Sequence, residues 1–261
     1  MGKYLLFEKK ESIGILTFNR PEKLNSLNIA LLKEFDEFIT SIEKESIQIL
    51  VLIGSGDKAF IAGADIKEMA GFTNEEFLQF IDLGQKITLN MEHSKIIFIA
   101  AVNGFALGGG FEMALACDLI YASTDARFGL PEVKLGIISG FGGTQRLSRL
   151  IGKNKASELI YTGKIISGDE AFRLGIVNRL VNSVELKSSV IELSSLIIKN
   201  SPLALKQAKK SINYGFNISI TEALELEKQI CSFCFASHDK NEGINAFIEK
   251  RIPNFHKDAS K

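Results

Sequence analysis

The sequence predicts an α/β fold, with strands and helices alternating over residues 1–200 and helices alone over residues 201–261. Two observations carry this prediction. Apolar runs of strand length recur through the first part and are followed by stretches with helical spacing, and after about residue 200 these runs stop. Strands joined by helices favour a parallel arrangement, here wound into a right-handed spiral of strand-strand-helix units.

The first unit is two strands and a helix. Residues 4–9 and 13–19 have strand composition, and the charged and small residues between them suit a hairpin or a tight connection. Asn28 is a good N-cap, so a helix is expected to begin there. Its apolar residues recur at spacings of three and four: Leu31, Leu32, Phe35, Phe38, Ile39 and Ile42.

The same order then returns along the chain. The expected elements are a buried strand over 47–54, a loop over 55–65, helical stretches to about His93, a strand over 96–102, a glycine-rich turn, a helix over 111–116, a strand over 117–123, a turn-rich segment over 128–145 and another helix.

The C-terminal part is expected to consist of helices over 201–216, 218–237 and 239–251. About 60 residues of this kind cannot bury much apolar surface alone. This part is therefore expected to pack on a neighbouring subunit or to fold back over the core.

Composition excludes several classes of partner. With 31 basic and 31 acidic residues the formal charge is zero, so no global charge favours nucleic acid or an anionic membrane. The longest apolar run, 96–102, is far too short to span a bilayer, and the apolar run in MGKYLLFEKK is too short for a signal peptide. Three cysteines do not make a disulfide framework, so we expect a cytoplasmic location.

Three consecutive glycines precede the expected helix 111–116 in LGGGFEM. Glycine lets backbone N–H groups approach a ligand closely, and a helix N-terminus adds the positive end of its dipole, so this turn can hold an oxyanion. A tight strand-to-helix turn packed against another backbone explains the glycines equally well. Neither a P-loop nor a clean dinucleotide fingerprint is present.

Glu112 and Glu132 lie twenty positions apart, each beside a turn that can aim it at a common point. Two carboxyls in different surroundings are what acid-base chemistry on one small molecule needs. Glu112 can instead simply complement a helix dipole. Glu132 follows Pro131 in an apolar segment, and its plainer explanation is a turn residue at a strand end.

The loop 55–65 ends in the small residues Ala62, Gly63 and Ala64 immediately before Asp65. Asp65 has the position of a helix cap, which leaves N–H groups near Ala64 free to point outward. The alternative is a capped helix start without further function.

Other polar groups indicate no site. Cys231 and Cys234 form a single C-x-x-C pair within an expected helix, which does not support a redox or metal centre. The histidines His93, His238 and His256 lack metal-ligand spacing, so no metal site is expected. Three lysines, Lys206, Lys209 and Lys210, form a small basic face that we expect to be solvated.

Several segments resemble the enoyl-CoA hydratase (crotonase) family: AGADIKEM, AAVNGFALGGGFEMALACD, FGLPEVKLGIISGFGGTQRL and NAFIEKR. The resemblance covers nearly the whole chain. It implies a crotonase-like spiral core over residues 1–200 and a helical region over 201–261, which serves trimerisation and completes the site of a neighbouring subunit. Trimers or hexamers built from two trimers are the implied assemblies, and no metal or redox cofactor is implied.

The resemblance also assigns roles within the site. Backbone N–H groups of Ala64 and Gly109 would form an oxyanion hole for a thioester carbonyl. Glu112 would be the base that activates water for attack at the β-carbon of a 2-trans-enoyl-CoA, and Glu132 the acid that protonates the α-carbon. The product would be a 3-hydroxyacyl-CoA in fatty-acid or short-chain acyl-CoA metabolism.

Substrate binding is implied for the loop that leads into the first short helix. Its residues are Ala62, Ala64, Asp65, Ile66 and Lys67, together with Gly109, and Lys67 offers charge near a phosphate. Arg20 and Lys23 are weaker candidates, which ordinary surface charge also explains.

Three residues depart from the family pattern. Leu130 stands where the family often has Gln, Ser139 where it often has Pro, and Phe111 where it often has Cys. Leu130 is expected to make the surroundings of Glu132 more apolar and to favour its protonated form. Phe111 and Ser139 are expected to reshape the acyl pocket.

Two further functions stay open on the sequence. An enoyl-CoA isomerase or a branched-chain enoyl-CoA hydratase is the nearest alternative, since this fold hosts several reactions. A non-catalytic, RNA-associated homologue belongs to another class, and the neutral charge together with both retained glutamates argues against it.

Overall fold

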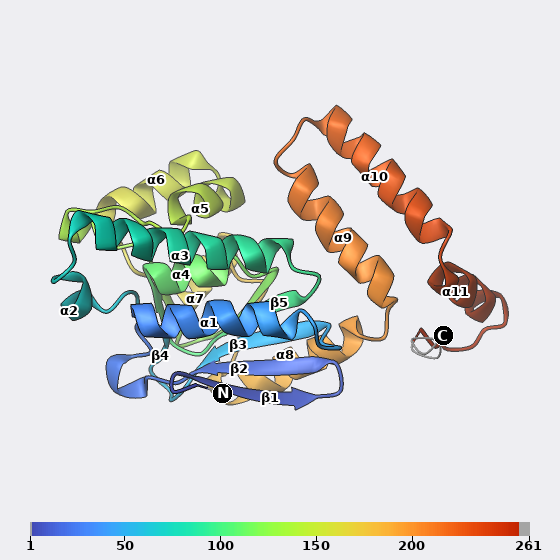
Figure 1. The fold of residues 1–261 in the computed structure, drawn as a ribbon, viewed down its shortest axis with the longest axis horizontal. Coiled ribbons are helices and arrows are strands. Elements are labelled where there is room, and N and C mark those ends of the chain that lie inside the picture. The colour runs from blue at the N-terminus through green and yellow to red at the C-terminus, as the bar shows by residue number, and fades with distance from the viewer. Residues whose placement is uncertain (1, 256–261) are drawn as a thin grey trace.

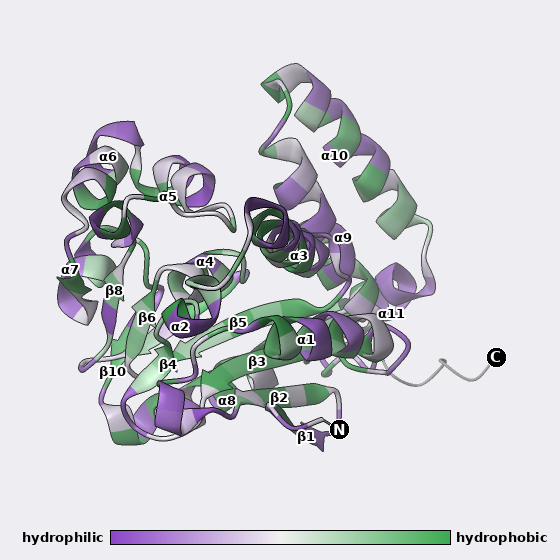
Figure 2. Ribbon diagram, turned by 60° about the vertical axis from the view of Figure 1, so that its left-hand side comes forward, coloured by the Kyte–Doolittle hydropathy of each residue, from purple (hydrophilic) through white to green (hydrophobic). Residues whose placement is uncertain are grey.

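The computed structural model describes residues 2–255, and its central element is a six-stranded sheet of order β1-β2-β3-β5-β7-β10. These strands are β1 (Leu5–Lys10), β2 (Ile13–Phe18), β3 (Ile49–Gly54), β5 (Ile97–Val102), β7 (Leu119–Ser123) and β10 (Arg179–Val181). β1 and β2 form the expected antiparallel hairpin, and the other neighbours are parallel. β3 and β5 are buried apolar runs, as parallel strands covered on both faces require (Figure 2).

A second, four-stranded sheet of order β4-β6-β8-β9 was missed in the sequence, where the first three segments fall in or at predicted loops and turns and the fourth has no assignment. Its strands are β4 (Ala59–Ile61), β6 (Phe105–Leu107), β8 (Arg127–Gly129) and β9 (Ile166–Ser167). Strands of two or three residues are too short to show an alternating pattern. These segments are strands because they pair with segments that are distant in the chain.

Helices cover the sheets (Figure 1). They are α1 (Ile29–Ile42), α2 (Ile66–Met69), α3 (Asn74–His93), α4 (Gly109–Leu115), α5 (Gly143–Ile151), α6 (Lys153–Thr162), α7 (Gly168–Arg173) and α8 (Leu186–Ile197), with 3-10 turns η1 (Pro21–Lys23), η2 (Glu132–Leu135) and η3 (Ser183–Glu185). The start of α1 is as predicted, because the Asn28 side chain accepts a hydrogen bond from the Leu31 N–H at 2.9 Å.

Each turn of the spiral places one strand in each sheet and then adds helices. β3 is followed by β4 and then α2 and α3, β5 by β6 and α4, and β7 by β8 and then α5. The predicted strand-strand-helix unit is therefore present, with short second strands. Since β4, β6 and β8 are parallel neighbours, their carboxyl ends lie at one edge of the short sheet.

The C-terminal helices α9 (Pro202–Gly215), α10 (Ile220–Phe235) and α11 (His238–Ile248) agree with the predicted helical region, whose residues 256–261 lie outside the described part. α10 and α11 extend away from the sheets (Figure 1). Among residues 2–255 no helix combines the length and apolar character needed to cross a membrane.

One lysine of the predicted basic face is not solvated. Lys209 is 6% exposed, and its Nζ donates to the carbonyls of Met91 and Ile96 and to Oδ2 of Asp118 at 2.6–2.8 Å. Lys206 and Lys210 are exposed, as expected. The buried ion pair attaches α9 to the core, a function that helical spacing does not reveal.

Candidate active site

A cavity of about 180 Å³ lies at the edge where β4, β6 and β8 end. This is where parallel α/β sheets generally hold ligands. The turns that follow these three strands contribute to its wall, together with α2, α3 and the segment 135–141: Ala62, Gly63, Ala64, Ile66, Met69, Phe77, Phe80, Ile81, Leu107, Gly108, Gly109, Glu112, Pro131, Glu132, Leu135, Ile137, Ile138, Gly140 and Phe141.

Glu112, in the first turn of α4, is only 2% exposed but lines this cavity. Its Oε1 accepts hydrogen bonds from the N–H groups of Phe141 at 2.8 Å and Gly143 at 2.6 Å. A Cβ on Gly143 would lie 3.0 Å from this oxygen, so a glycine allows the close approach. The carboxyl is thus held by a segment thirty residues away, which no local pattern could reveal.

Burial raises the pKa of Glu112 to about 7. The hydrogen bond from Gly143 opposes the rise, and the nearby charge of Glu132 adds to it. A carboxyl with this pKa is divided between its two forms at neutral pH, which suits a general base or acid.

Glu132 begins the 3-10 turn η2, directly after Pro131. Burial raises the pKa of Glu132, and the Ser139 hydroxyl nearby opposes the rise. Its Oε2 is buried and finds no hydrogen-bond partner among residues 2–255. The raised pKa has the direction expected for an acid that keeps its proton.

Leu130 lies beside Glu112. Its Cδ1 and the Glu112 Oε1 are both 3.0 Å from the position that a Cβ on Gly143 would take. The side chain is 1% exposed and does not line the cavity. Leu130 was expected to make the surroundings of Glu132 more apolar, and the structure places it beside Glu112.

Ala64 and Gly109 belong to two adjacent turns, and both residues line the cavity. Neighbouring N–H groups are occupied: Ala62 donates to Leu24, Asp65 to Leu27 and Gly108 to Gly129. Those of Ala64 and Gly109 donate to no backbone carbonyl within residues 2–255. Both residues line the cavity, so two N–H groups are available there to a ligand.

The close approach of these two turns depends on Gly110. A Cβ on Gly110 would lie 2.0 Å from the carbonyl oxygen of Ile61, at the end of β4. Gly108 has φ +48°, a conformation that favours glycine, and a Cβ there would come 3.1 Å from Oε1 of Glu132. The glycine run is therefore a tightly packed turn, as one of the two explanations held, and the Gly109 N–H within it has no backbone partner among residues 2–255.

The expected substrate-binding residues divide into two groups. Ala62, Ala64, Ile66 and Gly109 line the cavity, whereas Asp65 and Lys67 do not. Lys67 is exposed on α2 beside Ile66.

Asp65 occupies the predicted cap position, but its side chain makes no capping hydrogen bond and pairs with Arg20 at 3.0 Å. Burial raises the pKa of Asp65, but the hydrogen bond and charge of Arg20, the Glu68 N–H and the charge of Lys23 together outweigh it, so this pKa is lowered. Arg20 is itself buried and also donates to the Ser26 carbonyl at 2.6 Å. It is thus neither surface charge nor free for a phosphate, whereas Lys23 is exposed.

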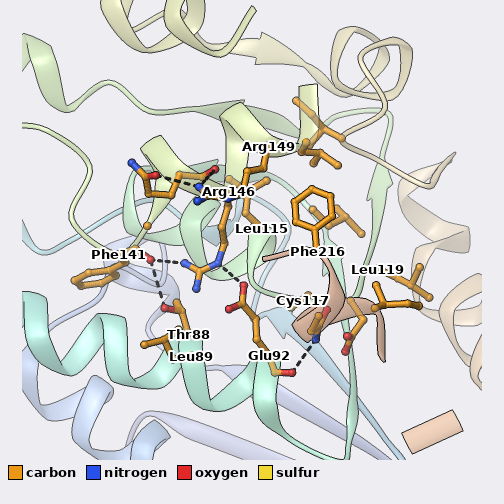
Figure 3. A pocket seen from close by; sticks show the side chains of 18 of the residues that line it. Thr88, Leu89, Glu92, Leu115, Cys117, Leu119, Phe141, Arg146, Arg149 and Phe216 are labelled. Atoms are coloured by element: carbon orange, nitrogen blue, oxygen red, sulfur yellow. Dashed lines mark hydrogen bonds and ion pairs between the residues drawn. The ribbon is translucent and has the colours of Figure 1, made fainter. Parts of the chain in front are cut away.

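Arg146 supports the segment that holds Glu112 (Figure 3). Its Nη1 donates to the Phe141 carbonyl at 2.7 Å, and its Nε pairs with Glu92 of α3 at 2.6 Å. Thr88 also donates to the Phe141 carbonyl at 3.4 Å. The sequence gives no sign of these roles, because the contacts join α3 to the segment 141–146 across more than fifty positions.

Aromatic rings form one wall of the cavity. Phe80 and Phe141 pack with ring centroids 5.2 Å apart, and Ile81 lies next to Gly140. Phe80 and Ile81 have no signal in the sequence beyond the apolar spacing of α3, and Phe141 lies outside any helix or strand. Phe111, expected to reshape an acyl pocket, instead packs into the core against Phe128 at 5.3 Å, and neither it nor Ser139 lines the cavity.

Within residues 2–255 there is no group of three His, Cys, Asp or Glu side chains that could hold a metal ion, and Cys231 and Cys234 are free. His256 lies outside the described residues.

Comparison with known proteins places these features in a family. The model of the enoyl-CoA hydratase/isomerase family matches residues 8–258. The chain is 46% identical to a short-chain-enoyl-CoA hydratase of Clostridium acetobutylicum, over 95% of both chains. It is 43% identical to a crotonyl-CoA hydratase of Syntrophomonas wolfei, over 96% of this chain and 97% of that protein.

The fold also agrees closely with those of solved structures. A crystal structure of enoyl-CoA hydratase from Bacillus anthracis superimposes with a TM-score of 0.95 at 39% identity, covering 97% of this chain and 99% of the other. The predicted crotonase-like fold is thereby confirmed. By its fold and by its sequence over nearly its full length, the chain belongs to the enoyl-CoA hydratase/isomerase family.

Proposed function

We propose that this protein is an enoyl-CoA hydratase, which adds water reversibly across the double bond of a 2-trans-enoyl-CoA to give a 3-hydroxyacyl-CoA. The observation that carries the proposal is the composition of one cavity. Two carboxyls with raised pKa values, Glu112 and Glu132, line it together with the residues whose N–H groups are available, Ala64 and Gly109.

The two N–H groups receive the thioester carbonyl oxygen. As the reaction proceeds, electrons of the double bond move toward this oxygen and an enolate forms. Hydrogen bonds from preorganised donors stabilise that charge, and losing one such donor typically costs about 3 kcal/mol of transition-state stabilisation.

The carboxyls move the protons. Ionised Glu112 takes a proton from water as the water oxygen bonds to the β-carbon, and protonated Glu132 delivers its proton to the α-carbon. Water is thus split between the two carbons, and the two carboxyls exchange their protonation states. Proton exchange with solvent restores the starting forms, and the reverse sequence dehydrates the product.

The acyl group is short in this proposal. The cavity of about 180 Å³ and the Phe80–Phe141 wall suit a few carbons beyond the thioester, and the two relatives described above are named for short-chain and crotonyl substrates. Lys67, exposed beside Ile66, has the charge and place to meet a phosphate of coenzyme A at the cavity rim.

The helical region 201–261 is proposed to join subunits into trimers or hexamers. Its described helices carry exposed apolar side chains, including Phe233, Phe235 and Phe247. A second cavity of about 860 Å³ opens between α9 and the core, with Phe216 and Leu150 exposed on its wall. Apolar patches of this kind mark interaction surfaces.

The chemistry needs only carboxyls and backbone N–H groups, so we propose that no metal or redox cofactor takes part. We also propose that the enzyme works in the cytoplasm, where its substrate is an acyl-CoA. Activity is then expected to survive dialysis against EDTA.

The test is hydration of crotonyl-CoA by purified protein, followed by loss of the thioester-conjugated absorbance. Glu112→Gln and Glu132→Gln are each expected to lower kcat by about 10²- to 10⁴-fold, as for the loss of a general acid or base. Wild-type rates in both variants contradict the mechanism. A 3-enoyl-CoA assayed in parallel distinguishes an isomerase, and branched and longer 2-enoyl-CoA thioesters define the pocket.

A further inference from the structure

Two buried oxygens beside the cavity lack hydrogen-bond partners among residues 2–255: Oε2 of Glu132 and Oγ of Ser139. Buried polar atoms are nearly always paired, so an unpaired one calls for an explanation. Ser139 is 6% exposed. Its neighbours Ile138 and Gly140 line the cavity but Ser139 does not, so it lies behind the wall.

The backbone brings these two residues together. The carbonyl of Glu132 accepts hydrogen bonds from the N–H groups of Gly136 and, at 3.3 Å, of Ile137, which folds the chain back after η2. Residues 137–140 therefore return past Glu132. The Ser139 hydroxyl on this returning segment lowers the pKa of the Glu132 carboxyl and so favours its charged form.

The two oxygens of Glu132 have different surroundings. Oε1 lies on the side of Gly108, next to the available N–H of Gly109. Oε2 is the buried, unpartnered oxygen. A serine hydroxyl can donate a hydrogen bond to a carboxylate and can accept one from a carboxylic acid, so it suits both protonation states of an acid that cycles.

From this geometry we infer that Ser139 is a positioning residue for Glu132: rotation of its side chain brings its hydroxyl into a hydrogen bond with Oε2, which pairs both orphaned oxygens and keeps Oε1 aimed at the substrate. The inference rests on the proposed hydratase function. It assigns the proton transfer to Oε1, and it gives Ser139 no contact with the substrate.

The test compares Ser139→Ala with wild-type protein. Without the hydroxyl, the charged form of Glu132 loses a donor, so its pKa rises. Glu132 must be protonated to deliver its proton, so the alkaline limb of kcat/KM for crotonyl-CoA hydration moves to higher pH while the acid limb stays. We expect kcat to fall on the order of tenfold, the effect of one hydrogen bond to a charged group, with little change in KM.

Three variants make the test specific. Ser139→Thr keeps the hydroxyl and is expected to keep the wild-type alkaline limb. Ser123→Ala removes another buried hydroxyl that has no partner among residues 2–255 and belongs to a residue that does not line the cavity, and it is expected to leave the pH profile unchanged. In a Glu132→Gln background, Ser139→Ala is expected to cause no further loss, because the two residues act as one unit.

The outcomes separate the inference from the proposed function. If wild-type protein does not hydrate any enoyl-CoA, the proposed function fails. If wild-type protein is active, either of two results overturns the inference: an unmoved alkaline limb in Ser139→Ala, or an equal loss in the Glu132→Gln background. Thermal unfolding of each variant identifies a loss that arises from misfolding.

Discussion

Three groups meet at Gly143: the carboxyl of Glu112, the side chain of Leu130 and the backbone N–H that holds the carboxyl. The apolar neighbour and the burial favour the neutral acid, whereas the N–H favours the charged form. The pKa of about 7 is the balance of these effects with the Phe141 N–H and the charges of Glu132 and Arg146. It places the base at the pH where small changes in its surroundings alter its charge most.

A first prediction concerns this balance. Leu130→Gln places an amide donor beside Glu112, so the pKa of Glu112 falls. Because the base must be ionised, the acid limb of the pH profile of kcat/KM is expected to move to lower pH by about one unit. Leu130→Met, of similar volume and apolar, serves as the control. An acid limb that moves equally in both variants refutes the explanation.

At the level of elements, the sequence predicted those helices and turns whose position depends on neighbouring residues in the chain. The apolar spacing and Asn28 predicted α1, and the three glycines predicted an N-terminus with free N–H groups. Strands of two or three residues have no period, so β4, β6, β8 and β9 could not be recognised, although they align the site. The donors to Glu112 from Phe141 and Gly143 were equally hidden, because a tertiary contact creates them.

Lys209 illustrates the same limit on α9. Its helical neighbours Lys206 and Lys210 are exposed, whereas Lys209 contacts Asp118 and two carbonyls, all about ninety or more positions away in the chain. Burial raises the pKa of Asp118, and the charge of Lys209 opposes the rise.

A second prediction follows for stability. Lys209→Met leaves the Asp118 carboxyl and two carbonyls buried without their donor, so the free energy of unfolding is expected to fall by about 3–5 kcal/mol. Lys210→Met, on the exposed side, is expected to change it by less than about 0.5 kcal/mol. Urea unfolding monitored by circular dichroism measures both. Equal effects would mean that the buried ion pair does not hold α9 to the core.

For the molecule as a whole, the arrangement of the C-terminal helices is the dominant feature. α10 and α11 lie away from the sheets (Figure 1) and expose apolar side chains that a monomer leaves in water, such as Phe247 at 85%. The proposed assembly would cover them.

A third prediction tests this. Sedimentation equilibrium is expected to give three or six times the 28.7 kDa of one chain. The double variant Phe233→Glu/Phe247→Glu is expected to sediment at a lower mass, since it places charges in an apolar interface. Val184→Glu, an exposed site on η3, is the matched control and keeps the wild-type mass. A monomeric wild-type protein contradicts the proposal.

The burial of Glu112 also has a thermodynamic consequence. The carboxyl titrates near 7 in the folded chain and near 4.5 when unfolded, so between these values the folded state holds a proton that the unfolded state has released. Stability therefore falls as pH rises through this window, by up to about 3 kcal/mol.

Glu112→Gln removes this loss while keeping an oxygen for the Phe141 and Gly143 N–H groups. The variant is expected to be more stable than wild type at pH 8 by up to about 3 kcal/mol and nearly equal to it at pH 5, as measured by urea unfolding. No difference between the two pH values would exclude a buried, hard-to-ionise Glu112. The residue that makes the site reactive is thus also one of the weakest points of the folded state.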